Sequence, residues 1–328
     1  MGAKSEPSSV ITILSRSARP APGGAAEHEP DRLDASIALL AAAPAGMLRP
    51  AIGGGRVMDI GSDRRGRLDR TADALVVPFQ QFFVTASVPC PYVPGRAERK
   101  LIVELAGRDA AEFYDELSRA GFRRSHRFSY RPACRSCAAC VPVRIAVERF
   151  AHTRSTRRVR NLNAGADGGA PNGRNGGALA GLVLAPRATE EQFELFVAYQ
   201  RSRHRDSEMA AMSYADYQGM VEDSAVHTAV VEFRETEGAL VAVSLIDRLD
   251  DGISAVYSFY DPTRHRRSLG TWCILWLVEE CRRAGLAYVY LGYWIAESPK
   301  MAYKARFPAL ERLARGRWIP FVAPTAGK

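Results

Sequence analysis

The aromatic residues of this chain are distributed unevenly, and their distribution limits which part of it can fold. The 13 Phe, 12 Tyr and 4 Trp residues all lie at or after Phe79. The segment before them is rich in Ala, Gly, Pro and Arg, and such a composition buries too little apolar surface to offset the entropy lost on ordering. We therefore predict a disordered N-terminal extension over residues 1–76 and a folded protein that starts near residue 77.

The hydropathy of the sequence argues against a membrane-spanning segment. No window approaches the roughly 18 consecutive apolar residues that a spanning helix needs. The longest apolar run, residues 37–44, lies too far from the N-terminus and behind too many acidic residues to be a signal peptide. We therefore expect a soluble cytoplasmic protein with no membrane partner.

Hydrophobic periodicity and turn residues predict a series of strands and helices. The predicted strands are residues 80–88, 100–105, 141–147, 227–234, 240–249, 253–260 and 288–293, and the predicted helices are 110–120, 189–203, 214–222 and 269–284. Residues 161–178 contain six glycines and no aromatic residue, which is typical of a loop. This Gly-rich loop predicts a boundary between an N-terminal domain, residues 77–160, and a C-terminal domain, residues 179–322.

The order of elements in the second half indicates the fold. The predicted order is two helices, an antiparallel meander of three strands, a helix and a further strand. This order is the layout of the acyltransferase fold of acetyl-CoA enzymes. We therefore expect an α/β (α+β) protein with a GNAT-like mixed sheet flanked by helices and a smaller, Cys-containing N-terminal domain. That fold binds a pyrophosphate at the start of its central helix. The equivalent residues 264–271 are basic but contain only Gly270 where a coenzyme A loop has paired glycines, so they predict a site for a different anion.

Positive charge is concentrated in one segment. The chain carries +9 overall, whereas residues 119–160 hold twelve arginines and a single acid, Glu148. Arginine forks pair with phosphates and stack on bases. A structured RNA is favoured over DNA because no groove-reading motif is present, and a solvated basic face is the alternative. The candidate phosphate contacts are Arg123, Arg124, Arg127, Arg157 and Arg158.

The cysteines form a pattern that is known from metal sites. Cys134, Cys137 and Cys140 have CxxCxxC spacing, and Cys90 lies upstream of them. Three closely spaced thiolates and a fourth remote one can hold zinc or an iron–sulfur cluster. Disulfides are unexpected in a cytoplasmic chain. The alternative is that the cysteines are reduced and pack as small apolar residues.

Lysine is rare in this arginine-rich chain. Of the five lysines, Lys100, Lys300 and Lys304 lie away from the termini. A compact ammonium suits a narrow site better than a planar guanidinium does. A helix that starts at Pro299 would place Lys300 and Lys304 on one face. The pair therefore predicts a pocket for a carboxylate, with a solvated helix face as the alternative.

Several ordered blocks of sequence resemble one family. In the first half they are Cys90-Pro91-Tyr92, Phe122-Arg123-Arg124 and residues 130–144. In the second half they are Arg203-His204-Arg205, Val256-Tyr257-Ser258-Phe259-Tyr260-Asp261-Pro262, Ser268-Leu269-Gly270-Thr271, Leu291-Gly292-Tyr293-Trp294-Ile295 and residues 298–307. The blocks resemble the arginyl-tRNA–protein transferases, and among them most closely the bacterial aspartate/glutamate leucyltransferases. Residues 1–78 have no counterpart in the family, and Met58 is an alternative start that would give its usual extent.

The resemblance implies a function and its partners. The family has an acyltransferase-like fold and needs neither ATP nor coenzyme A. This branch moves leucine from leucyl-tRNA to a protein with an N-terminal Asp or Glu, which marks that protein for degradation. An arginyl donor, a coenzyme A-dependent N-acetyltransferase and a non-catalytic zinc-containing RNA-binding module are the alternatives. The resemblance implies a metal site at Cys90, Cys134, Cys137 and Cys140, although the first turn motif here has one cysteine where eukaryotic relatives have two.

The implied reaction assigns roles to individual side chains. Aminolysis of an ester needs aligned reactants, a proton acceptor and a stabilised oxyanion. We expect Asp261 to hold or deprotonate the attacking ammonium, although an Asp before a proline is also a common turn former. We expect Tyr293 to donate to the oxyanion or to the leaving ribose hydroxyl. The two lysines would hold the carboxylate of the acceptor, and the other expected substrate-binding residues are Arg203, His204 and Gly270.

Overall fold

The computed structural model describes residues 80–164, 178–205 and 207–322. The chain divides into two units, Met1–Val77 and Pro78–Lys328, and the described residues all lie in the second. The predicted extension over residues 1–76 and most of the predicted Gly-rich loop therefore lie outside the described residues. In the described part of the chain, no helix is both long and apolar enough to cross a membrane.

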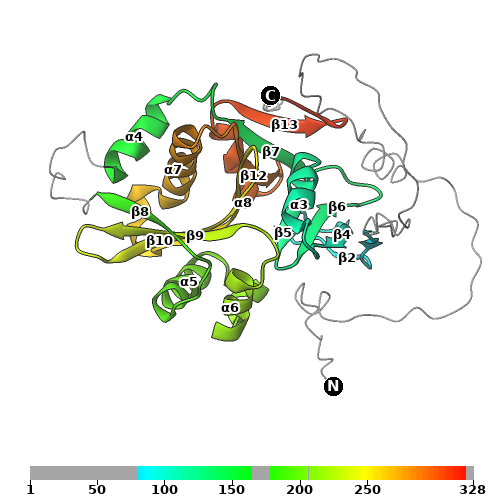
Figure 1. Cartoon of the computed structure of the whole chain (residues 1–328), viewed down its shortest axis with the longest axis horizontal. Helices are drawn as coiled ribbons and strands as arrows, with labels where there is room; N and C mark the ends of the chain where they lie inside the picture. The colour runs from blue at the N-terminus through cyan, green and yellow to red at the C-terminus, as the bar shows by residue number, and fades with distance from the viewer. Residues whose placement is uncertain (1–79, 165–177, 206, 323–328) are drawn as a thin grey trace, which may run out of the picture. The chain divides into compact units, whose positions relative to one another are not determined.

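The first half of the second unit contains a small antiparallel sheet (Figure 1). Its strands lie in the order β1 (Phe82–Val84), β4 (Lys100–Glu104), β6 (Phe128–Pro132) and β5 (Arg123–Ser125). A ribbon of β2 (Val88–Pro89) and β3 (Ala97–Glu98) precedes β4. Helix α3 (Ala110–Arg119) contacts this sheet through Phe113, whose ring centre lies 6.4 Å from that of Phe82 in β1. The predicted strand 80–88 is thus two short strands in different sheets.

The other strands form one eight-stranded sheet in the order β14–β13–β7–β12–β11–β10–β9–β8. The strands are β7 (Val141–Ala146), β8 (Leu179–Leu184), β9 (Thr228–Glu235), β10 (Leu240–Arg248), β11 (Gly252–Tyr260), β12 (Tyr288–Trp294), β13 (Leu310–Ala314) and β14 (Arg317–Pro320). Neighbours are antiparallel except β11 and β12, which are parallel. Strand β7 comes from the predicted N-terminal domain and lies between β12 and β13. The two predicted domains, 77–160 and 179–322, therefore share this sheet.

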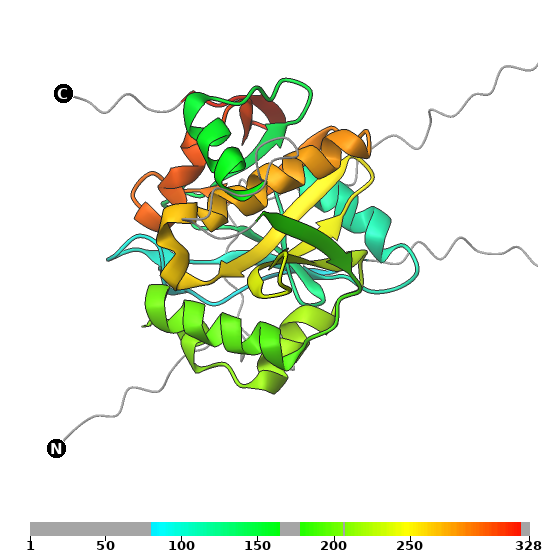
Figure 2. The ribbon, with the colours of Figure 1, turned by 90° about the vertical axis from the view of Figure 1, so that its left-hand side faces the viewer.

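Helices cover both faces of the eight-stranded sheet (Figures 1 and 2). Helices α4 (Arg154–Asn163) and α7 (Leu269–Arg283) lie on one face, and α5 (Glu190–Arg203) and α6 (Tyr214–Glu222) lie on the other. Successive residues of β9 alternate between these faces, as the strand period of two requires. Val231 belongs to the hydrophobic core under α7, whereas Val230 belongs to the core with α5 and α6. The predicted mixed α/β sheet flanked by helices is confirmed.

Short helices follow the parallel strand pair. The 3-10 helix η2 (Pro262–Arg267) leads from β11 into α7, and α8 (Pro299–Ala302) with the 3-10 helix η3 (Tyr303–Arg306) follows β12. A third 3-10 helix, η1 (Glu208–Ala211), joins α5 to α6. Parallel strands point the same way, so η2, α8 and η3 lie at the same edge of the sheet. This edge carries most of the residues predicted to bind substrate.

Candidate functional site

Strands β11 and β12 pair over only three residues each, and beyond that point β11 is bonded to Arg123 instead. Arg123 belongs to β5 of the small sheet. It donates from Nη1 to the Ser254 hydroxyl at 3.0 Å, and from Nη2 to the carbonyl oxygens of Ala255 at 2.5 Å and Val256 at 3.2 Å. Backbone carbonyls without a strand partner need another donor, and the guanidinium supplies it. These bonds use three of the five guanidinium hydrogens, and the side chain is partly exposed, so the phosphate contact of Arg123 stays a prediction.

Gly292 in β12 makes room for the same arginine. Its φ is +73°, and an added Cβ would lie 2.7 Å from Nε of Arg123. A side chain at this position would therefore meet both a disfavoured backbone conformation and a steric clash. Arg123 thus lies against β12 as well as β11, between the two strands where they have separated.

Aromatic and basic side chains gather around Tyr260, the last residue of β11. The ring centre of Tyr199 in α5 lies 4.8 Å from that of Tyr260, and the guanidinium of Arg203 lies 6.0 Å from it. At the start of α7, an added Cβ on Gly270 would lie 3.1 Å from the Tyr260 ring. His204 stands 5.5 Å from Tyr199, measured between ring centres. The structure thus brings together Arg203, His204 and Gly270, which the sequence predicts to bind substrate.

Lys300 adds a further cation to this cluster. Burial, followed by the charges of Lys300 and Arg203, lowers the pKa of His204. Lys300 therefore lies close enough to His204 for its charge to be felt there, while its own side chain is exposed. The lowered pKa favours the neutral imidazole, which can both accept and donate a hydrogen bond.

Lys304 is buried, unlike Lys300. The residue is 8% exposed, and its Nζ donates to the carbonyl oxygen of Tyr293 at 2.6 Å. Burial, and then the charge of Arg123, lowers its pKa to about 7. The prediction that both lysines share one helix face is wrong, because α8 ends at Ala302 and the chain tightens into η3 before Lys304. A 3-10 turn holds three residues, so positions four apart no longer align.

Asp261 caps the turn that follows β11. Its carboxylate accepts from the Thr263 amide at 2.9 Å, the Thr263 hydroxyl at 2.6 Å and Nε of Arg264 at 3.0 Å. Burial opposes its ionisation, but these hydrogen bonds outweigh burial and lower its pKa. A carboxylate that is so well bonded is a weak base. The expectation that Asp261 deprotonates the ammonium is contradicted, and the turn-forming alternative fits the geometry. The other part of the expectation, that Asp261 holds the ammonium, stays a prediction.

Tyr293 faces the small sheet. Its hydroxyl donates to the carbonyl oxygens of Gly121 at 3.0 Å and Tyr130 at 3.1 Å, and burial raises its pKa well above the ordinary value. One hydroxyl hydrogen shared between two carbonyls leaves none for an oxyanion. The predicted catalytic role of Tyr293 is therefore contradicted, and the residue ties β12 to the small sheet instead.

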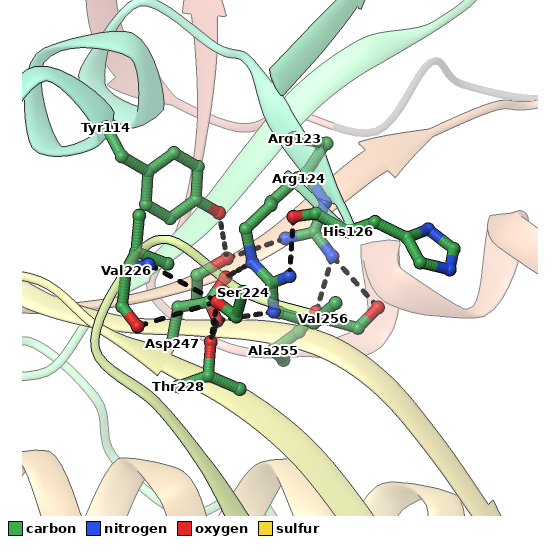
Figure 3. A network of polar contacts seen from close by, with 11 residues as sticks. Tyr114, Arg123, Arg124, His126, Ser224, Val226, Thr228, Asp247, Ala255 and Val256 are labelled. Atoms are coloured by element: carbon green, nitrogen blue, oxygen red, sulfur yellow. Dashed lines mark hydrogen bonds and ion pairs between the residues drawn. The ribbon is translucent and has the colours of Figure 1, made fainter. Parts of the chain in front are cut away.

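Arg124 lies in the interior, at the centre of a polar network (Figure 3). Its Nε and Nη2 donate to the two carboxylate oxygens of Asp247 in β10 at 2.8 and 2.7 Å, and its side chain is 1% exposed. The Thr228 hydroxyl donates to the same carboxylate at 2.7 Å. Arg124 is thus unable to contact a phosphate, contrary to the prediction. The other three predicted phosphate contacts, Arg127, Arg157 and Arg158, are exposed.

The predicted anion site before α7 is partly neutralised. Arg264 and Arg267 donate to Glu235 at 2.5 and 2.9 Å. Asp261 and residues 263–267 line a surface hollow of about 370 Å³, and another hollow of about 490 Å³ lies beside α5 and η1. Arg266 and His265 are exposed. These two side chains keep the hollow basic.

The four cysteines of the predicted metal site lie near one another. Burial, and then the thiols of Cys134, Cys90 and Cys137, raises the pKa of Cys140 to about 12. Cys137 accepts a hydrogen bond from Nη1 of Arg96 at 3.1 Å. However, no three Cys, His, Asp or Glu side chains within the described ranges are placed to hold a metal ion. This arrangement does not fit a ligand set, and the zinc or iron–sulfur cluster stays a prediction.

Sequence reasoning missed two residues of the site. Tyr199 and Tyr260 form the aromatic surface around which the basic side chains gather. Tyr260 ends a strand inside a block of family resemblance, which is a signal for it. Tyr199 lies in the middle of a helix, and its position carries no comparable signal.

The strand order, with one parallel pair that separates beside a basic and aromatic cluster, agrees with the acyltransferase layout expected from the sequence. Residues 88–158 match the N terminus of the arginine-tRNA-protein transferase family, and residues 191–314 match its C terminus. The chain therefore belongs to the arginine-tRNA-protein transferase family and is an aminoacyltransferase.

Similar proteins carry a more specific name. Proteins of Gluconacetobacter diazotrophicus, Paramagnetospirillum magneticum and Rhodospirillum rubrum, each named aspartate/glutamate leucyltransferase, are 51% identical to this chain. The matches cover 74%, 75% and 73% of this chain and 88%, 95% and 93% of those proteins. Among solved structures, L-PGS from Bacillus licheniformis aligns with 59% of this chain and 54% of its own, at 13% identity and a TM-score of 0.35. That likeness is too low to bear on the site.

Proposed function

We propose that this protein transfers leucine from leucyl-tRNA to the N-terminal α-amino group of proteins that begin with Asp or Glu. The proposal rests on the 51% identity with three relatives of that name over 88–95% of their length. We further propose that transfer takes place in the cytoplasm and marks the acceptor for degradation.

The reaction is the aminolysis of an activated ester. The acceptor nitrogen forms a bond to the leucyl carbonyl carbon, the bond from that carbon to the ribose oxygen breaks, and a proton passes from the nitrogen to the leaving hydroxyl. Because the ester is already activated, the reaction needs neither ATP nor coenzyme A. The protein contributes alignment of the two ends and an environment for the oxyanion.

A coenzyme A-dependent acetyltransferase fits the site less well. The residues before α7 lack paired glycines. In addition, Arg123 stands between β11 and β12, and it is fixed there by three hydrogen bonds to β11. Both features favour a substrate other than coenzyme A.

The exposed arginines provide the surface for the tRNA. Arg157 and Arg158 lie in α4 and Arg127 follows β5, and all three point into solvent. Each guanidinium can pair with a phosphate, and together they make binding dependent on salt. Arg266, at the hollow before α7, adds a cation at the edge of the sheet where β11 ends.

A transfer assay tests the proposal. Purified protein is incubated with radiolabelled leucyl-tRNA, arginyl-tRNA or acetyl-CoA and with a peptide that begins with Asp, and the same peptide beginning with Asn is the control. We expect label on the Asp peptide from leucyl-tRNA alone. Label from arginyl-tRNA would reassign the donor, and label from acetyl-CoA would contradict the proposal.

A further inference from the structure

One buried cation differs from the others. Within the described residues, the buried cationic residues are Arg124, Arg144, Arg267 and Lys304. The three arginines are each paired with an acid, namely Asp247, Glu311 and Glu235. Lys304 makes no ion pair with any described residue, and its Nζ contacts are the carbonyl oxygen of Tyr293 and the sulfur of Met301. Buried charges are normally paired, so Lys304 has no counter-charge when it is protonated.

Arg123 also lacks an acidic partner among the described residues. Its described acceptors are a hydroxyl and two carbonyl oxygens, all neutral, and its Nε has no acceptor among the described residues. It lies against Gly292 of β12, and Lys304 is bonded to the carbonyl oxygen of the next residue, Tyr293. Two cations thus lie close together at the end of β12, and the described residues provide no acid between them.

A single carboxylate would correct this imbalance. It would accept from Nε or the second Nη1 hydrogen of Arg123 and from Nζ of Lys304, which has hydrogens to spare. Charge-assisted hydrogen bonds of this kind are about twice as strong as neutral ones. A ligand can reach the pair from solvent, because Arg123 is partly exposed and Lys304 is 8% exposed.

We infer that Arg123 and Lys304 together bind the side-chain carboxylate of the acceptor's first residue. The inference rests on the proposed function and deepens it. Arg123 comes from the small sheet and Lys304 from η3 after β12, so acceptor recognition requires both parts of the fold. An Asn or Gln side chain has nearly the same shape but leaves the two cations unneutralised. The site would therefore select Asp and Glu over Asn and Gln by charge.

Arg123→Gln is the first test, because it removes the charge and keeps part of the polar contact with β11. With leucyl-tRNA saturating, we expect KM for an Asp peptide to rise by about ten- to a hundredfold. We also expect the ratio of kcat/KM for Asp over Asn peptides to fall towards one, while leucyl-tRNA affinity stays within about twofold. Arg108→Gln is the matched control, because it removes an exposed arginine of the same half of the unit. It should leave the ratio unchanged.

Lys304→Met provides an independent test if Arg123→Gln fails to fold. It keeps most of the stem, removes the charge and should reduce the same Asp/Asn ratio. An unchanged ratio in a folded Lys304→Met variant, or in a folded Arg123→Gln variant, overturns the inference. A loss of leucyl-tRNA affinity at constant ratio also overturns it, and assigns the two cations to the RNA. Absence of leucyl transfer by the wild-type protein would instead overturn the proposed function.

Discussion

Replacing Asp247 by Ala should destabilise the protein by about 3–5 kcal/mol, the cost of leaving one partner of a buried ion pair alone. The side chains of Arg124 and Asp247 are 1% and 0% exposed. Asp247 accepts two hydrogen bonds from Arg124 and one from the Thr228 hydroxyl. Without it, the guanidinium keeps the carbonyl oxygen of His126 as its described acceptor. Arg124 lies in β5 and Asp247 in β10, so the loss falls on the contact between the two sheets.

Urea and thermal unfolding measure this loss. A domain of this size loses about 2–4 °C of Tm per kcal/mol, so Tm should fall by roughly 6–20 °C. The double variant Arg124→Met/Asp247→Leu removes both charges and should recover most of the stability, because a buried pair can be replaced by apolar side chains at little cost. The control is Glu104→Ala. Its ion pair with Arg127 spans 3.7 Å with both side chains half exposed, so its loss should cost less than about 1 kcal/mol.

Two outcomes would refute this reasoning. A loss below about 1 kcal/mol in Asp247→Ala would mean that water or another group compensates the buried guanidinium. A double variant as unstable as the single one would mean that packing, rather than the uncompensated charge, sets the cost.

Four further predictions follow from the site. Tyr293→Phe should cost about 1–2 kcal/mol of stability with little change in kcat; a hundredfold fall in kcat at full stability would restore its catalytic role. Gly292→Ala should lower stability by more than about 1 kcal/mol, because the left-handed φ and Arg123 both oppose a Cβ; an unchanged Tm would contradict the placement of Arg123. Lys304 has a folded-state pKa of about 7 against an ordinary value of 10.5, so between these pH values the unfolded chain binds more protons. Wild-type stability relative to Lys304→Met should therefore rise with pH through this window, by at most about 1.4 kcal/mol per unit, and a constant difference between pH 7 and 9 would count against a buried Lys304. Replacing an exposed arginine of the cluster with Gln should reduce the slope of log affinity for tRNA against log salt by about one per lost contact, measured by filter binding. An unchanged slope would mean that the arginine contacts solvent and not the tRNA.

The long helices could be predicted from the sequence because each carries local signals. Helix α5 starts with a capping box at Thr189 and Gln192, and α6 has one at Ser213 and Asp216. Helix and strand bounds in the second half agree with the predicted ranges to within about a residue. The pairing of strands could not be predicted in the same way. A hydrophobic period of two shows which face of a strand is buried, but it does not show which strand lies beside it. Edge strand β8 and the β13–β14 hairpin are absent from the predicted elements, and nothing local placed β7 in the large sheet.

The predicted site residues separate into two groups for physical reasons. Arg203, His204 and Gly270 are brought together because the end of α5 and the start of α7 meet at one edge of the sheet, beside Tyr260. Some arginines of the cluster are exposed and others are buried, depending on whether an acidic partner lies nearby in the fold. A count of charges does not reveal such partners, because Asp247 lies 123 residues from Arg124 in the chain. Whether an arginine contacts RNA or an internal carboxylate depends on such distant partners. Composition alone could therefore predict a basic surface but not its members.

Strand β7 cannot complete its pairing until nearly the whole chain has been synthesised. It ends at Ala146, whereas its neighbours β12 and β13 begin at Tyr288 and Leu310. At about 5–20 residues per second, the wait on the ribosome is roughly 7–30 s. During that time both edges of an apolar strand are open to other chains, which is the condition that favours aggregation. Nascent chains that stop before β12 should therefore need chaperones, and fragments of that length should aggregate rather than accumulate as a folded N-terminal half.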